Sequence, residues 1–176
     1  SVTTTTLLLD RPPPAQMGVF DILFKLIEDI GRWVKSLFGY SALSIQKGVI
    51  IDAGSNYQKT FTFNTQAIPK SSCYDPVVYQ SGRCNYLNKC YMIMPKGCAD
   101  ISCAAKKDCA DITSTAQAVE TLSVSYIPTQ LSSEYAVVAF IAQSDMTYDT
   151  GSKTWSENTF IVESTKQSDV ITVPGA

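Results

Sequence analysis

The sequence predicts a mainly β protein with one N-terminal amphipathic helix, in which an antiparallel β-sandwich or barrel of Ig-like or jelly-roll-like type carries a disulfide-rich insertion. Residues 18–38 show the apolar spacing of a helix. From residue 40 onward, short β-branched and aromatic segments alternate with turn signals about every eight to twelve residues, which is typical of sandwiches and barrels. All six cysteines lie within one stretch, residues 73–109.

The chain begins with a segment that favours an extended strand. Residues 1–9 are rich in β-branched and apolar side chains, and the three prolines at 12–14 then form a stiff spacer. We therefore expect a β-prone arm and proline spacer over residues 1–17. A terminal strand of this kind can add to a sheet edge of its own domain or of a neighbouring subunit; the alternative is a frayed tail.

The amphipathic helix is expected over residues 18–39. Its charged and small polar side chains fall within an arc of about 120°, so that about 200° of the helix surface is apolar, more than an ordinary surface helix shows. Its acidic and basic side chains balance, whereas membrane-surface helices are usually basic. Four hypotheses explain the excess apolar surface: packing between subunits, a position in a membrane interface, a plug for a β-barrel or cover for a sheet within the same monomer, or membrane insertion of a toxin-like module.

The residues expected at a subunit or membrane contact are the apolar side chains of the arm and the helix. They are Val2, Leu7, Leu8, Leu9, Phe20, Leu23, Phe24, Leu26, Ile27, Ile30, Trp33, Val34, Leu37 and Phe38.

The β domain is expected over residues 40–176, interrupted by the Cys-rich insertion at 73–109. Its predicted strands cover residues 44–51, 57–63, 121–126, 135–142, 146–150, 153–157, 159–163 and 169–173. The run at 135–142 is continuously apolar, which indicates a strand buried on both faces. Gly151 and Ser152 predict a hairpin turn.

The cysteines predict three disulfides in an irregular segment. They are Cys73, Cys84, Cys90, Cys98, Cys103 and Cys109, with 10, 5, 7, 4 and 5 residues between successive members. Only one of these intervals falls in the range of a zinc-binding cysteine pair, so a metal site fits poorly. The sequence leaves all fifteen pairings open. Disulfides indicate an oxidising location, with a hyperthermophile's interior as the exception.

The composition argues against catalysis and against nucleic-acid binding. The chain has no histidine, which removes the commonest general base and metal ligand. It shows no catalytic or phosphate-binding motif, and we expect no enzymatic activity, no cofactor and no metal. The net charge is −2 and no Lys/Arg cluster is present, which is unlike a nucleic-acid-binding surface. Charged residues make up only 17%, a composition that favours an extracellular or assembled protein.

Together these features favour a structural subunit of an extracellular assembly, either a surface filament or pilus-like fibre or a virion coat. It would assemble with further copies of itself through arm exchange and helix packing, at the cell surface, in the extracellular space or in a virion. The alternative is a secreted, disulfide-rich, toxin-like binding module whose helix lies in a membrane interface.

Overall fold

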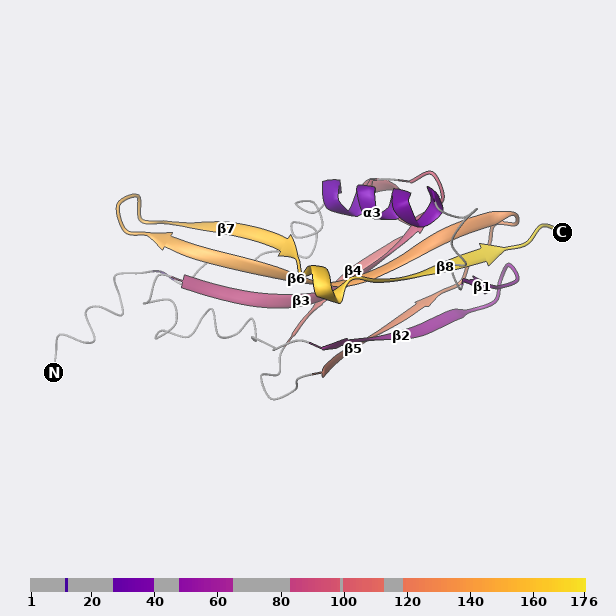
Figure 1. The fold of residues 1–176 in the computed structure, drawn as a ribbon, viewed down its shortest axis with the longest axis horizontal. Coiled ribbons are helices and arrows are strands. Elements are labelled where there is room, and N and C mark those ends of the chain that lie inside the picture. Colours follow the sequence, from indigo (N-terminus) through magenta and orange to yellow (C-terminus); the bar gives the residue numbers. More distant parts are fainter. Residues whose placement is uncertain (1–11, 13–26, 40–47, 65–82, 99, 113–118) are drawn as a thin grey trace.

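The computed structural model describes residue 12 and residues 27–39, 48–64, 83–98, 100–112 and 119–176, and Figure 1 shows their arrangement. Within these ranges the protein is mainly β with one α-helix, which confirms the predicted class, and the main sheet curls into a half-barrel. In chain order the elements are α3 (Ile27–Gly39), β1 (Val49–Ile50), β2 (Tyr57–Asn64), β3 (Arg83–Pro95), η2 (Ile101–Cys103), β4 (Lys106–Asp111), β5 (Val119–Tyr126), β6 (Ser133–Asp149), β7 (Thr154–Ile161), η3 (Glu163–Thr165) and β8 (Gln167–Val173).

Strand β6 is the centre of the main sheet. Along one side it pairs with antiparallel β3 over nearly its whole length, and β4 continues the sheet beyond β3. Along the other side, the first half of β6 pairs with β8 and the second half with β7. β1 pairs in parallel with β8, which gives the order β1-β8-β6-β3-β4 with β7 as a branch. Because β6 is 17 residues long, it extends through most of the long axis of the molecule (Figure 1).

Helix α3 covers one face of the main sheet. The buried side chains of the helix are Ile30, Val34 and Leu37, and they join a core cluster with residues of β3 and β6. Trp33 packs beside them, with its ring edge-on to Phe140 at a centroid distance of 6.1 Å. The opposite side of α3 is polar and exposed, so α3 serves as cover for its own sheet.

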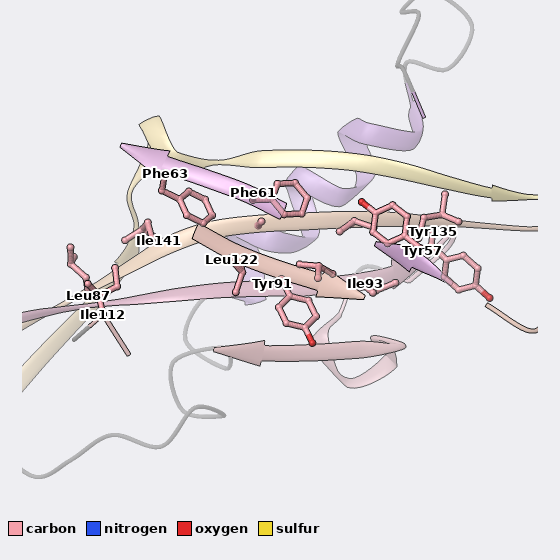
Figure 2. Packing of buried hydrophobic residues seen from close by; sticks show 14 of the residues in the cluster. Tyr57, Phe61, Phe63, Leu87, Tyr91, Ile93, Ile112, Leu122, Tyr135 and Ile141 are labelled. Carbon is pink, nitrogen blue, oxygen red and sulfur yellow. The ribbon is translucent and has the colours of Figure 1, made fainter. Parts of the chain in front are cut away.

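A separate two-stranded sheet covers the other face. β2 and β5 pair antiparallel, and their alternating patterns turn one face inward. Figure 2 shows Phe61 and Phe63 of β2 and Leu122 of β5 packed with residues of β3 and β6 such as Ile93 and Ile141. The main sheet therefore lies between two apolar cores, one under the helix and one under the β2–β5 pair.

The Cys-rich segment differs from the predicted irregular insertion. Residues 83–95 form β3, a long strand next to the centre of the main sheet. Its residues alternate between two buried faces, with Cys90, Met92 and Met94 toward the helix and Leu87, Tyr91 and Ile93 toward the β2–β5 pair. A strand that is apolar on both faces lacks the alternation of a half-buried strand. The sequence prediction therefore relied on the number of cysteines, which favoured an irregular insertion.

Two predicted strand breaks are also wrong. β6 is continuous through residues 143–145, and β7 is continuous where two short strands were expected. The polar residues that suggested a break in β6 are satisfied within the sheet. The amide Nε2 of Gln143 donates to Asp145 Oδ1 at 2.7 Å, and the Ser144 and Thr159 hydroxyls are hydrogen-bonded at 3.0 Å. Bonded polar side chains of this kind can remain inside a strand.

Candidate assembly surface

The structure accounts for part of the predicted contact set. Ile30, Val34 and Leu37 lie in the domain's own core, and Trp33 and Phe38 are partly buried against it. Outside the described residues lie Val2, Leu7, Leu8, Leu9, Phe20, Leu23, Phe24, Leu26 and the side chain of Ile27. Contact of the arm and of the first half of the helix with a neighbour therefore stays a prediction.

Four cysteines form two disulfides that hold the β3–β4 region. Cys90 and Cys109 lie directly opposite each other on β3 and β4, with a Cα–Cα distance of 4.1 Å. Cys98 and Cys103 close the connection between these strands. Cys73 and the side chain of Cys84 lie outside the described residues. The two disulfides indicate an oxidising environment.

The free edge of β5 is covered by lysines from the main sheet. Lys89 Nζ of β3 donates to the Thr121 carbonyl at 2.8 Å, and Lys106 Nζ of β4 donates to the Ser125 carbonyl at 2.8 Å. Both carbonyls point away from β2, the direction in which another strand would have to pair. Lys89 Nζ also lies 3.5 Å from the nearly buried carboxylate of Glu120, and this ion pair holds the lysine side chain in place. Lysines on an edge of this kind oppose strand addition.

The free edge of β2 is covered from the other side by β8. Gln167 Nε2 donates to the Thr62 carbonyl at 2.7 Å. The Tyr57 hydroxyl donates to Asp169 Oδ2 at 2.8 Å, and Lys59 Nζ lies 3.6 Å from the same oxygen. Burial and the hydrogen bond to the Asp169 carboxylate raise the pKa of Tyr57 above its ordinary value. The β2–β5 pair is thus joined to the main sheet by side chains on both sides, in addition to the shared apolar core.

The outer edge of β4 is charged. Its residues include Lys106, Lys107, Asp108 and Asp111, and charged side chains on an edge strand oppose pairing with another chain.

The outer edge of β1 is exposed and apolar. The Ile51 amide donates to the Thr172 carbonyl of β8 at 2.9 Å, so the backbone N–H and C=O of Ile50 face the opposite direction, away from the sheet. Val49 is 37% exposed and Ile50 is 78% exposed. Among the described residues, β1 pairs with β8 only. A Cβ at Gly48 would lie 2.7 Å from the Val170 carbonyl oxygen, which shows how closely the chain approaches β8 where β1 begins.

Other exposed apolar side chains lie at the same end of the molecule. Gly54, just after β1, donates its amide to the Pro128 carbonyl, which places Ile127 at this end. The Ser132 amide donates to the Pro174 carbonyl beyond β8, which places Leu131 there as well. Four of the six large apolar side chains that are exposed in the described part of the chain gather here: Val49, Ile50, Ile127 and Leu131. We call these four residues the apolar end, and exposed apolar surface of this kind marks protein contacts.

A pocket of about 880 Å³ opens beside the apolar end. It lies where β3 and β8 end and β6 begins, and the connection from β5 to β6 forms one of its walls. Lys96 and Glu134 form an ion pair of 3.0 Å at its rim. The Tyr126 and Tyr135 rings meet edge-on at 5.4 Å inside, and burial together with Tyr135 raises the pKa of Tyr126. This mixture of aromatic, hydroxyl and paired charged groups suits an uncharged polar ligand better than an ion.

Comparison of the chain with protein-family models, with curated proteins and with solved structures found no match. In the described ranges, no helix is long and apolar enough to cross a membrane. The same part of the chain contains no group of three or more His, Cys, Asp or Glu side chains arranged to hold a metal ion.

The sequence prediction did not single out β1 or the apolar end. Residues 44–51 were expected to form one strand among several, and Ile127 and Leu131 fall in a connection that carried no clear signal. The one sequence feature that could have indicated β1 is the run Val49-Ile50-Ile51, because it is apolar on both faces. Only the strand order shows that this run lies at an edge.

Proposed function

We propose that the chain is a non-catalytic structural subunit that assembles with copies of itself, in an extracellular filament or pilus-like fibre or in a virion coat. The observation that carries this proposal is the contrast between sheet edges. The edges of β2, β4 and β5 are covered or charged, whereas β1 is exposed and apolar and belongs to the apolar end. Strand β7 also pairs with β6 alone in the described part of the chain, but Phe160 is its one large apolar side chain that is exposed. An edge left open in this way is a surface for strand addition.

Two further features support a role outside the cell. The two disulfides of the β3–β4 region are of a kind that forms and persists in oxidising environments, and the low charge content suits a protein whose surface is shared with neighbours. The side-chain closure of the half-barrel by the β2–β5 pair also supports the barrel variant of the predicted fold over an Ig-like or jelly-roll-like sandwich.

The test is the assembly state of the native protein. We expect negative-stain electron microscopy to show regular filaments or shells, and light scattering without detergent to give masses far above the 19.2 kDa of the chain. Reduction of the disulfides provides a control, because a protein that assembles only after its disulfides are broken is aggregating from an unfolded state. A monodisperse monomer over the full concentration range would contradict the proposal.

The second candidate is a secreted binding module, and the pocket beside the apolar end favours it. A concave site at the mouth of a β-barrel is a common position for a ligand. The variant in which the helix enters a membrane interface would require α3 to leave the sheet, because Ile30, Val34 and Leu37 are buried there. The same mass measurement separates the two candidates, since a binding module stays monomeric.

A further inference from the structure

Pro12, the one described residue of the predicted N-terminal arm, lies at a defined place. The indole Nε1–H of Trp155 on β7 donates to the carbonyl of Pro12 at 2.8 Å, although the two residues are 143 positions apart. Trp155 also packs on Tyr148 of β6, with ring centroids 5.2 Å apart. Pro12 is therefore held at the β6–β7 end of the molecule, opposite the end that carries β1 (Figure 1).

The length of the arm excludes contact between residues 1–9 and β1 of the same chain. Trp155 lies opposite Tyr148, and Thr172, the neighbour of Ile50, lies opposite Glu134. These two positions on β6 are 14 residues apart, or about 46 Å at the rise of a β-strand. A fully extended chain covers about 40 Å between residues 12 and 1, and only about 11 Å between residues 12 and 9. Pairing along β1 is thus out of reach within one chain.

From these positions we propose that residues 1–9 of one copy add as a strand to the outer edge of β1 in the next copy. This inference rests on the proposed function and specifies its interface. The β1 edge offers the outward N–H and C=O of Ile50, and the apolar end offers cover for the alternate apolar side chains of the arm. The lysine-covered edge of β5 offers no equivalent acceptor.

The proposed contact joins opposite ends of an elongated molecule. It is heterologous, because the arm is the donor and β1 is the acceptor, so each bound copy still presents one free arm and one free edge. Such contacts produce an open filament unless the rotation between copies closes a ring. The molecule, which is extended along β6, then lies lengthwise from one contact to the next.

Two complementary variants test the contact. A chain without residues 1–9 keeps the acceptor edge and Pro12 but has no donor. Ile50→Pro keeps the donor and removes the outward N–H of the acceptor, and it breaks no hydrogen bond to β8 because that N–H faces away from β8. We expect each variant alone to be monomeric and an equimolar mixture to form a heterodimer of about twice the monomer mass, resolved by native mass spectrometry.

Matched substitutions provide the controls. Ile50→Lys places a charge on the edge and should also prevent assembly, whereas Val119→Lys makes a comparable change at an exposed position on β5 and should leave assembly intact. Circular dichroism and melting temperature confirm that each variant is folded. Filaments formed by Ile50→Pro would refute β1 as the acceptor while leaving the proposed function in place. A monomeric mixture of the two variants, or polymers of the truncated chain, would refute the arm–β1 contact, and a monomeric native protein would overturn both proposals.

Discussion

At the scale of single residues, Asp169 connects the two sheets. Its carboxylate lies almost fully buried, where an unpaired charge would be costly, and it accepts hydrogen bonds from the Tyr57 hydroxyl and the Val170 amide. Lys59 supplies a positive charge 3.6 Å away. Tyr57 and Lys59 of β2 and Val170 of β8 therefore stabilise one buried charge. These contacts help to fix the position of β2 relative to β8.

The Tyr57–Asp169 hydrogen bond predicts a pH dependence of stability in alkaline solution. The pKa of Tyr57 is raised in the folded state, so the folded chain holds this proton more tightly than the unfolded chain does. The stabilisation is complete below pH 10 and is lost as the pH rises above the unfolded value of about 10, at about 1.4 kcal/mol per pH unit for one group. Urea unfolding at several pH values from 8 to 11.5 measures this slope.

Tyr57→Phe is the matched control for that slope. It should lower the free energy of unfolding by about 1–2 kcal/mol at neutral pH, because a buried carboxylate loses a donor. It should also make the free energy of unfolding fall less steeply above pH 10, by the contribution of one proton. The slope that remains is due to residues such as Tyr91 and Tyr126, whose pKa values are also raised. An unchanged slope in Tyr57→Phe would show that Tyr57 ionises normally in the folded protein.

At the scale of elements, the two disulfides differ in what they restrain. Cys90–Cys109 spans 19 residues and joins two paired strands within the helix-side core, whereas Cys98–Cys103 spans 5 residues and restrains the short connection. Loop-closure entropy gives about 3 kcal/mol for the longer loop and about 2 kcal/mol for the shorter one. The cross-strand disulfide is also more buried, since Cys103 is exposed.

We therefore expect the Cys90→Ala/Cys109→Ala variant to lose more stability than the Cys98→Ala/Cys103→Ala variant. The loss should be about 3 kcal/mol or more in the first case and about 2 kcal/mol or less in the second, since removal of buried sulfur atoms adds a packing cost to the first. Chemical unfolding without reductant measures both values. Equal losses would mean that the β3–β4 ladder holds its strands in register without help from the disulfide.

At the scale of the whole molecule, the β2–β5 pair is attached to the main sheet by side chains rather than by paired backbone. It shares no backbone ladder with the main sheet and is held by the apolar core and by side chains such as Lys89, Lys106 and Gln167. β3 and β6, in contrast, pair along 13 residues. Layers with fewer backbone hydrogen bonds to the rest of a protein open at lower free energy.

Hydrogen exchange should separate these layers. We expect amides of β2 and β5 to exchange earlier than those of β3 and β6, and we expect Lys89→Ala/Lys106→Ala to accelerate exchange in β2 and β5 while β3 and β6 remain protected. Mass spectrometry of the native protein and of the chain without residues 1–9 measures this difference. Simultaneous exchange of all four strands would mean that the molecule opens as one cooperative unit.

The sequence by itself determined the features that depend on neighbouring residues. The alternation of β2 and β5 and the apolar face of α3 are local patterns, and the structure confirms them. The clustering of cysteines correctly predicted disulfides at Cys90, Cys98, Cys103 and Cys109. The failure to predict β3 has a local reason too. The strand is buried on both faces, but polar residues such as Asn88 and Lys89 interrupt the continuous apolar run by which residues 135–142 were predicted.

Only the tertiary structure decided which sheet edges are covered and that the edge of β1 is exposed. Lys89 reaches Thr121 and Lys106 reaches Ser125 because β5 lies across β3 and β4, and nothing in the spacing of these residues indicates that arrangement. The same holds for Trp155 and Pro12, which lie at opposite ends of the sequence. Cysteine pairing and edge exposure depend on contacts between distant segments, and such contacts follow from the strand order of the folded chain rather than from any local pattern.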